Sequence, residues 1–275
     1  MNQTQKKIPY RVIVLIAASL ALIFAFAYWI ALSKESSIKN GLLSSLPLPL
    51  LLVENRPIYS DDFFSRTQAH KIIFGNDSAN LAEAKTQILQ RLLYEKQLEI
   101  LASRQKARLG DWRDFASLPG AEIEKNQVLK SAVALEAKED TFKFWFYSQA
   151  QLNQEAYKTA NFVLDELKNG KDFQELAKIY SQDISSMQFG GDLGPVLAEN
   201  LMFEFKEKLL QSKSGDALII PSRLGLHIVQ IYMKKIQGEG KDVLYLKQIF
   251  LKASDFVEWA KEETKDYKII NIINI

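Results

Sequence analysis

The sequence offers few side chains that could carry out chemistry on a bound substrate. It has two histidines, His70 and His227, and no cysteine among its 275 residues. The absence of cysteine excludes disulfides, thiolate metal sites, a cysteine nucleophile and a lipid-modified N-terminal cysteine. Two histidines also argue against a multi-histidine metal centre. We therefore predict that the protein has no thiolate or multi-histidine metal site.

The two histidines stand in different sequence patterns. His70 falls on a predicted helix, where a solvated or capped side chain is the ordinary case. His227 lies inside the apolar strand pattern of residues 226–231. A histidine in such a strand is ordinarily a core residue whose ring nitrogens are hydrogen-bonded. The pattern alone leaves open whether His227 is a core residue or part of a site.

The bulk composition limits the classes of partner. The chain has 35 basic and 33 acidic residues, so it has no strong electrostatic field that would recruit nucleic acid. Its hydrophobic content of 47%, with 16 Phe and 10 Tyr, is enough for a folded core. We expect a folded protein with no nucleic-acid partner.

Residues 12–32 form an uncharged apolar run long enough to span a membrane. As a helix rising 1.5 Å per residue, the run would cover roughly 30 Å of hydrocarbon. It has no polar face, and Trp29 near its end suits the membrane interface, so we expect an uncleaved anchor; a cleaved signal peptide is the alternative. Lys6, Lys7 and Arg11 precede the run with no acidic residue among them. The positive-inside rule then places the N-terminus in the cytoplasm and the bulk of the chain outside.

The next part of the chain predicts a stalk and a helical module. Residues 33–52 are rich in Ser, Pro and Leu, as a stalk would be. Residues 50–59 predict a strand, a turn and a second strand that Pro57 restricts to a sheet edge. Apolar residues at helical spacing then predict a long amphipathic helix over 81–107 and, after glycine and proline breaks, another over 121–138.

A denser series of elements follows. The spacing of apolar residues predicts three helices, over residues 156–167, 173–180 and 202–210. Asp172 stands at the N-cap position of the second helix. A glycine-centred turn, GGDLG at residues 190–194, separates the second helix from the third, and the strand of His227 ends the series.

Four motifs in this series carry a resemblance to a known family. In chain order they are NGKDFQELAKIYSQD, GGDLG, LMFEF and SRLGLHIVQI. Their order and spacing resemble the parvulin-type (rotamase, PpiC-like) peptidyl-prolyl cis/trans isomerase domain, whereas GGDLG alone would be a weak signal. Upstream, VENRPIYSDDFF and ILQRLLYEKQLEILA are similar, more loosely, to the helical chaperone module that precedes such domains in exported parvulin foldases.

The resemblance implies a non-covalent reaction in an apolar pocket, with no metal and no cofactor. The conjugated amide resists rotation with a barrier of about 18–20 kcal/mol. A catalyst needs an apolar cup for the proline ring and an environment that favours the twisted amide over the planar one. By resemblance, Leu193, Leu201 and Phe205 form the cup, and His227 is one of a pair of histidines at its floor. Ile184 takes a loop position where some relatives carry a cysteine or an aspartate, and its apolar side chain cannot polarise the substrate.

The family's other histidine belongs to a first strand for which the sequence offers two candidates. Residues 142–147 stand at the expected place but are aromatic and contain no histidine. Residues 243–251 have a strong strand pattern and follow the His227 strand after a hairpin loop. Gln248 then takes the place of the histidine as a catalytic residue beside His227. Such a domain would be permuted, with a C-terminal strand in the first-strand position, and we favour this candidate over 142–147.

Together these patterns predict an α+β protein whose parvulin-like domain has an antiparallel four-stranded sheet with helices. The expected segments are a cytoplasmic tail, a transmembrane anchor, a stalk, a helical chaperone-like module and a parvulin-like domain, over residues 1–11, 12–32, 33–52, 53–140 and 141–275. We expect a single-pass cell-membrane protein that isomerises prolyl bonds in unfolded or nascent exported polypeptides. The alternative is a non-catalytic, membrane-tethered holdase with a degenerate parvulin domain, which the missing histidine and Ile184 favour.

Overall fold

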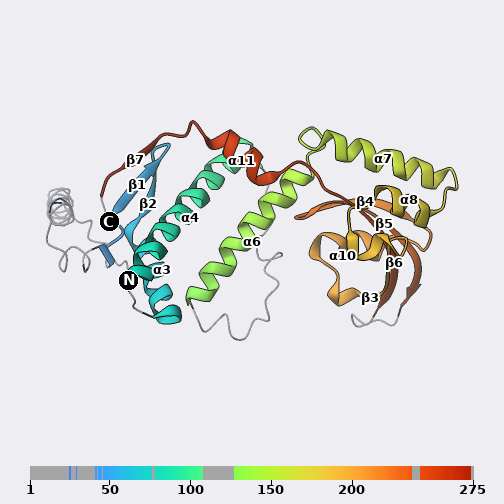
Figure 1. The fold of residues 1–275 in the computed structure, drawn as a ribbon, viewed down its shortest axis with the longest axis horizontal. Helices are drawn as coiled ribbons and strands as arrows, with labels where there is room; N and C mark the ends of the chain where they lie inside the picture. Colours follow the sequence, from blue (N-terminus) through green and yellow to red (C-terminus); the bar gives the residue numbers. More distant parts are fainter. Residues whose placement is uncertain are drawn as a thin grey trace, which may run out of the picture. The chain divides into compact units, whose positions relative to one another are not determined.

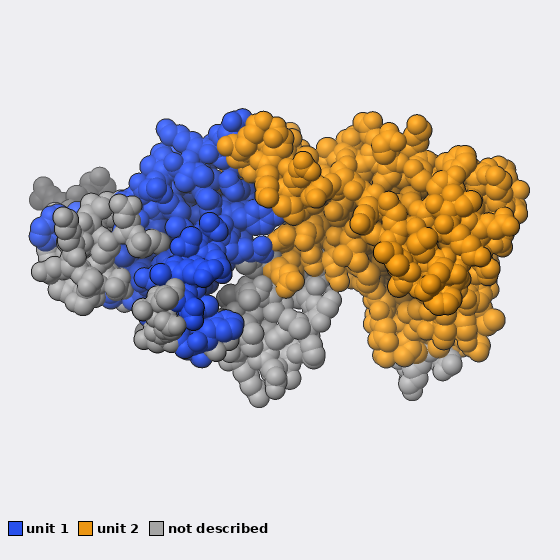
Figure 2. All heavy atoms as spheres, in the orientation of Figure 1, with its two compact units in different colours: residues 1–99, 266–275 blue, residues 100–265 orange. Residues whose placement is uncertain are grey.

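The computed structural model describes residues 25, 29, 41, 43, 44, 46–75, 78–107, 127–236 and 242–273. The chain divides into two compact units (Figure 2): unit 1 comprises residues 1–99 and 266–275, and unit 2 comprises residues 100–265. The predicted membrane span lies outside the described residues apart from Ala25 and Trp29. Within the described part, no helix is both long enough and apolar enough to cross a membrane.

Unit 1 contains a three-stranded antiparallel sheet in the order β2-β1-β7. Strands β1 (Pro49–Val53) and β2 (Arg56–Tyr59) form the predicted hairpin, and Pro57 lies on the edge strand. The third strand, β7 (Ile269–Asn271), pairs with β1. Residues near 50 and residues near 270 therefore lie side by side in one sheet, as Figure 1 shows.

Unit 1 also contains the helix α3 (Ser60–Phe74) and the larger part of the helix α4 (Ser78–Arg104). Helix α4 is the long amphipathic helix predicted over 81–107. Arg66 of α3 donates two hydrogen bonds of 2.8 Å to the carboxylate of Glu95 on α4. A bidentate pair of this kind fixes orientation as well as distance, so it sets how the two helices face each other.

Unit 2 is built on a four-stranded antiparallel sheet in the order β3-β6-β5-β4. Its strands are β3 (Asp192–Leu197), β4 (Ala217–Ser222), β5 (Gly225–Lys235) and β6 (Val243–Leu251). Strand β6 pairs with β5 from the Leu226–Leu251 pair to the Lys235–Val243 pair. Residues 243–251 are therefore the strand beside His227, as the sequence favoured.

The other candidate for that strand, residues 142–147, is helical and was a wrong alternative. These residues are the end of α6 (Gln127–Tyr147), which runs past the predicted helix end at 138. Phe142, Trp145 and Phe146 recur at helical spacing, and all three contact α11 (Phe256–Thr264). An aromatic run without alternating polar residues does not distinguish a strand from a helix, and here the packing partner decides for the helix.

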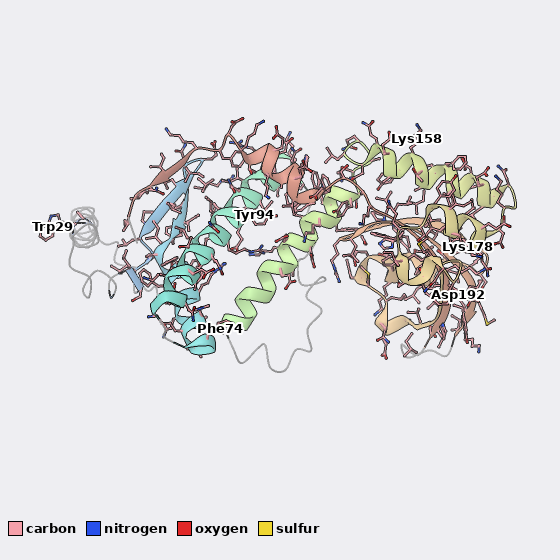
Figure 3. All side chains as sticks on the ribbon, viewed as in Figure 1. Trp29, Phe74, Tyr94, Lys158, Lys178 and Asp192 are labelled. Carbon is pink, nitrogen blue, oxygen red and sulfur yellow. The ribbon has the colours of Figure 1, made fainter. Side chains whose placement is uncertain are left out.

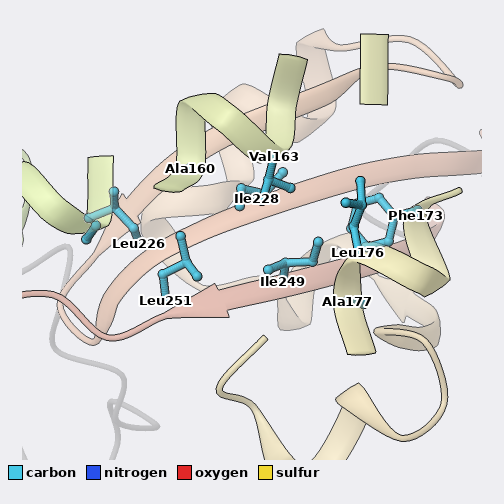
Figure 4. Close-up of a cluster of buried hydrophobic side chains, with 10 residues drawn as sticks. Ala160, Val163, Phe173, Leu176, Ala177, Leu226, Ile228, Ile249 and Leu251 are labelled. Carbon is cyan, nitrogen blue, oxygen red and sulfur yellow. The ribbon is translucent and has the colours of Figure 1, made fainter. Parts of the chain in front are cut away.

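Helices cover both faces of the sheet of unit 2. Helices α7 (Gln154–Lys168) and α8 (Phe173–Tyr180) pack on one face, where Leu226 and Ile228 of β5 meet their apolar side chains (Figure 4). Asp172 caps α8 as predicted, because its carboxylate accepts hydrogen bonds from the amides of Gln174 and Glu175. The exposed side chains on these two helices include Lys158 and Lys178, labelled in Figure 3.

Helix α10 (Phe203–Gln211) packs on the opposite face of the sheet. It is the third predicted helix, displaced by one residue from the prediction over 202–210. Its Phe205 and Leu209 join a buried cluster with Val229 and Ile231 of β5. Because side chains alternate along a strand, His227 points to the same face as Val229 and lies under α10.

Candidate active site

Four side chains from separate elements form a continuous hydrogen-bonded chain in unit 2. His227 on β5 is 4% exposed, and its Nδ1 lies 2.9 Å from Oε1 of Gln248 on β6. Its Nε2 lies 2.8 Å from the hydroxyl of Ser222, the last residue of β4. The Nε2 of Gln248 donates in turn to Oδ2 of Asp183, at 3.2 Å. The sheet topology brings these residues together from positions up to 65 apart in the sequence.

The charge on Asp183 determines the direction of every hydrogen bond in this chain. A carboxylate only accepts, so the Gln248 group that faces it must be the amide NH₂, and the amide oxygen must face His227. An amide oxygen also only accepts, so Nδ1 of His227 carries the proton and Nε2 is the acceptor for the Ser222 hydroxyl. The Ser222 oxygen accepts in its turn from the amide of Leu224 at 3.0 Å. The network thus selects one tautomer of His227.

The surroundings of His227 keep its ring neutral. Burial lowers the pKa of His227 from 6.5 to about 4, although the Gln248 hydrogen bond and the charge of Asp183 act in the opposite direction. Burial would raise the pKa of Asp183, but hydrogen bonds from Ser185, Ser186 and Gln248 outweigh it and lower that pKa. At neutral pH the site therefore holds an uncharged imidazole and an ionised carboxylate, joined through Gln248.

We predict that wild-type stability falls as the pH drops from about 6.5 to about 4. The unfolded chain binds a proton at His227 below its ordinary pKa of 6.5, whereas the folded chain resists until about pH 4. The corresponding free-energy loss is on the order of 3 kcal/mol. Denaturant unfolding at several pH values measures it, and His227→Asn is expected to remove this part of the pH dependence.

The ¹⁵N NMR signals of the histidine rings provide the matching spectroscopic test. The chain has two histidines, so His70→Gln leaves a single set of ring signals that belongs to His227. We expect a neutral ring with its proton on Nδ1 down to about pH 4. An imidazolium at pH 6, or a neutral ring with its proton on Nε2, would contradict the proposed direction of the network.

The glycine turn of the GGDLG motif holds the start of β3 against Gln248. Gly191 has φ +77°, a left-handed conformation that favours glycine. The carbonyl oxygen of Gly191 accepts a hydrogen bond from the backbone amide of Gln248 at 2.7 Å. The backbone amide of Gly191 donates to the carbonyl oxygen of Ser186 at 2.9 Å. A Cβ on Gly191 would lie 2.3 Å from the carbonyl oxygen of Gln248. The second glycine of the motif is therefore required for this close approach of two backbones.

The predicted cup residues take different positions around His227. The ring of Phe205 packs edge-on against the His227 ring with 4.9 Å between centroids. Leu201 packs against the same apolar cluster as Phe205. Leu193 follows the first residue of β3 and is 38% exposed, so it remains available to a ligand. The structure thus joins Phe205 to His227, and the roles of Leu193 and Leu201 in a cup stay predictions.

Asp183 and Ser222 are site residues that the sequence analysis did not single out. The resemblance directed attention to Ile184, but Ile184 begins the short helix α9 (Ile184–Met187) and is 81% exposed. Asp183, one residue earlier, supplies the carboxylate. It also caps α9 by accepting from the amide of Ser185. An aspartate just before a helix is a local signal for such a cap, but nothing local tied Asp183 to Gln248.

Part of this chain is similar in sequence to known proteins. Residues 119–235 match a protein family described as the PPIC-type PPIase domain. This chain carries a PPIC-type PPIase domain. The match ends with β5, so β6 and Gln248 lie beyond it. The sequence-based resemblance to the parvulin type is confirmed.

Several curated relatives carry a similar segment. "Foldase protein PrsA 1" of Bacillus cereus is 30% identical over 127 residues, which cover 40% of this chain and 44% of the relative. "Foldase protein PrsA" of Geobacillus kaustophilus is 38% identical over 89 residues, 31% of this chain and 32% of the relative. "Chaperone SurA" of Legionella pneumophila is 31% identical over 128 residues, 44% of this chain and 29% of the relative. The chain spans less than half the length of each of these relatives.

Proposed function

We propose that this protein is a peptidyl-prolyl cis/trans isomerase that assists the folding of exported polypeptides. The observation that carries the proposal is the buried, neutral His227, held in one tautomer by Ser222 and Gln248 and covered by Phe205. This arrangement lies in the segment that matches the PPIC-type PPIase domain, except for the glutamine. It combines an apolar wall with a preorganised polar floor, as a non-covalent rotation of an amide requires.

We propose further that the domain is permuted. In the family the first strand stands beside the strand of the second histidine, and here β6 lies between β5 and β3. Gln248 of β6 replaces the first histidine and accepts from Nδ1 of His227. The amide is a neutral acceptor at every pH, so it holds the same hydrogen bond without a titration of its own.

Within this proposal each group has a defined task. Leu193, Leu201 and Phe205 hold the proline ring, and the amide rotates about its C–N bond while no covalent bond forms or breaks. Both ring nitrogens of His227 are engaged by Ser222 and Gln248, so His227 orders the floor of the site. An apolar site favours the twisted amide because the planar amide has the larger charge separation and loses more hydration on entry.

The clients and the location follow from two separate observations. The relatives are named foldase and chaperone, which supports unfolded polypeptides as the clients. The uncharged run of residues 12–32, with basic residues before it, supports a single membrane anchor and an extracytoplasmic site of action. We propose that the anchor keeps the isomerase where exported chains emerge.

A second candidate function is that of a non-catalytic holdase, a chaperone that binds unfolded chains without isomerising them. Two observations favour it: Gln248 stands where the family has histidine, and Ile184 points into solvent. In a holdase the cup would bind apolar segments, and no rate would change.

We predict that wild-type protein accelerates isomerisation of a proline-containing peptide and that His227→Ala reduces turnover more than peptide affinity. The reason is that His227 orders the site for the twisted amide, whereas the cup holds the ring in both states. Phe205→Ala is expected to weaken both, because it removes the apolar wall. The measurements are the isomerisation rate and suppression of client aggregation for each protein.

Phe162→Ala is the matched control for Phe205→Ala. Phe162 lies on α7, on the opposite face of the sheet, and is 49% exposed. Phe162→Ala should leave the isomerisation rate and the suppression of client aggregation unchanged. A wild-type rate equal to that of buffer, together with suppressed aggregation, would decide for the holdase.

A further inference from the structure

We infer that Arg223 is a positioning residue that holds the site around His227 by neutralising a buried carboxylate. The carboxylate belongs to Glu204, in the first turn of α10, and its side chain is 0% exposed. Arg223 lies between β4 and β5, and it also reaches α6 through Asp140. The effect on catalysis rests on the proposed isomerase function; the effect on the geometry of His227 does not.

Glu204 depends on Arg223 for its hydrogen bond and for its neighbouring positive charge. Its Oε1 accepts from the backbone amide of Arg223 at 3.1 Å and lies 3.8 Å from Nη1 of the guanidinium. Its Oε2 is buried and has no hydrogen-bond partner among the described residues. A buried carboxylate is strongly unfavourable without a nearby positive charge. Loss of the guanidinium would therefore leave the buried carboxylate of Glu204 without a neighbouring positive charge.

The same guanidinium connects the turn to α6. Its Nε lies 3.4 Å from Oδ2 of Asp140, and both side chains are about one-fifth exposed, at 21% each. Asp140 also lies 3.7 Å from Lys143 on its own helix. Arg223 thus joins three elements, α6, α10 and the β4–β5 turn, at one point.

Arg223 and the buried Glu204 each have a chain neighbour that contacts His227. Ser222 precedes Arg223, and its hydroxyl binds Nε2 of His227. Phe205 follows Glu204, and its ring packs on the His227 ring. A displacement of either backbone segment would therefore carry one of these contacts with it. An ion pair to a buried carboxylate adds little net stability compared with apolar residues in its place, so we expect the contribution of this one to be geometric.

The test uses the full chain and three variants, Arg223→Met, Glu204→Gln and the double variant. Methionine keeps the apolar stem and removes the charge, and glutamine keeps the shape of Glu204 without needing a cation. We expect Arg223→Met to shift the ring NMR signals of His227 and to lower kcat roughly 10- to 100-fold at little change in KM. The double variant should recover the wild-type His227 signals and most of the lost rate.

Arg91→Met, which removes a surface partner of Glu95 on α4, is the matched control and should change neither readout. Unchanged His227 signals in Arg223→Met would overturn the inference, and so would a double variant that stays as perturbed as the single one. If Arg223→Met alone fails to fold, a folded double variant with native His227 signals supports the inference, and an unfolded one overturns it. A wild-type protein without isomerase activity would refute the proposed function, while the NMR comparison would still decide the role of Arg223.

Discussion

A chain that ends after Ile236 is expected to lose the folded structure of unit 2. The truncation removes β6, whose Leu244, Leu246, Ile249 and Leu251 are at most 5% exposed. At about 1.5–3 kcal/mol for each buried side chain, their loss amounts to roughly 6–12 kcal/mol. The total stability of a domain is about 5–15 kcal/mol, so the expected loss is comparable to the whole. Thermal unfolding and the His227 ring signals measure the outcome.

A chain that ends after Lys252 is the control for this truncation. It keeps β6 and loses α11 and β7, so it separates the loss of the strand from the loss of the C-terminal segment. We expect it to keep the His227 signals of the full chain, although its α6 loses the aromatic partners on α11. A folded unit 2 in the chain that ends after Ile236 would show that β5 does not need β6 beside it. That result would remove the basis for a permuted domain.

Gly191→Ala is expected to destabilise unit 2 and to release Gln248 from His227. The new Cβ would meet the Gln248 carbonyl oxygen at 2.3 Å and the Ala177 side chain at 3.1 Å, and the backbone conformation at φ +77° is itself strained for alanine. Together the strain and the overpacking should cost about 2–5 kcal/mol. The measurements are the free energy of unfolding and the ¹⁵N shift of Nδ1 of His227.

Gly194→Ala separates the two causes. Gly194 has a similar φ of +66°, but a Cβ there would meet no atom within 4 Å. Gly194→Ala should therefore lower the free energy of unfolding by the conformational strain alone, roughly 1–2 kcal/mol, and leave the NMR signals of His227 unchanged. Equal effects of the two substitutions would mean that the contact between Gly191 and Gln248 does not limit the packing of β3 on β6.

Local patterns predicted most of the elements of unit 2. The helices α7, α8 and α10 follow from apolar residues at helical spacing, and the Asp172 cap follows from its position before Phe173. Such features depend on residues within one or two turns, which is why they can be found without a fold. The aromatic residues 142–147 gave a wrong alternative, because their helix is selected by Phe256 and Trp259 more than 100 residues later.

The candidate site was predicted in part. His227, Gln248 and Phe205 lie together in the structure, as the resemblance to the parvulin type implied. Asp183 and Ser222 were missed because each has a sufficient local explanation, the first as a helix cap and the second as the end of a strand. Only the pairing of β6 with both β5 and β3 shows that Asp183 reaches His227 through Gln248.

The sequence by itself determined the family of the domain, the periodicity of its helices and the two possible strands beside His227. These properties depend on motifs and spacings of residues that lie close to one another along the chain. The tertiary structure decided which strand stands beside His227, which tautomer its ring adopts, and that Arg223 pairs with the buried Glu204. The physical reason is that a hydrogen-bond direction, a burial cost and a charge pairing each depend on atoms that only folding brings within about 3–4 Å of one another.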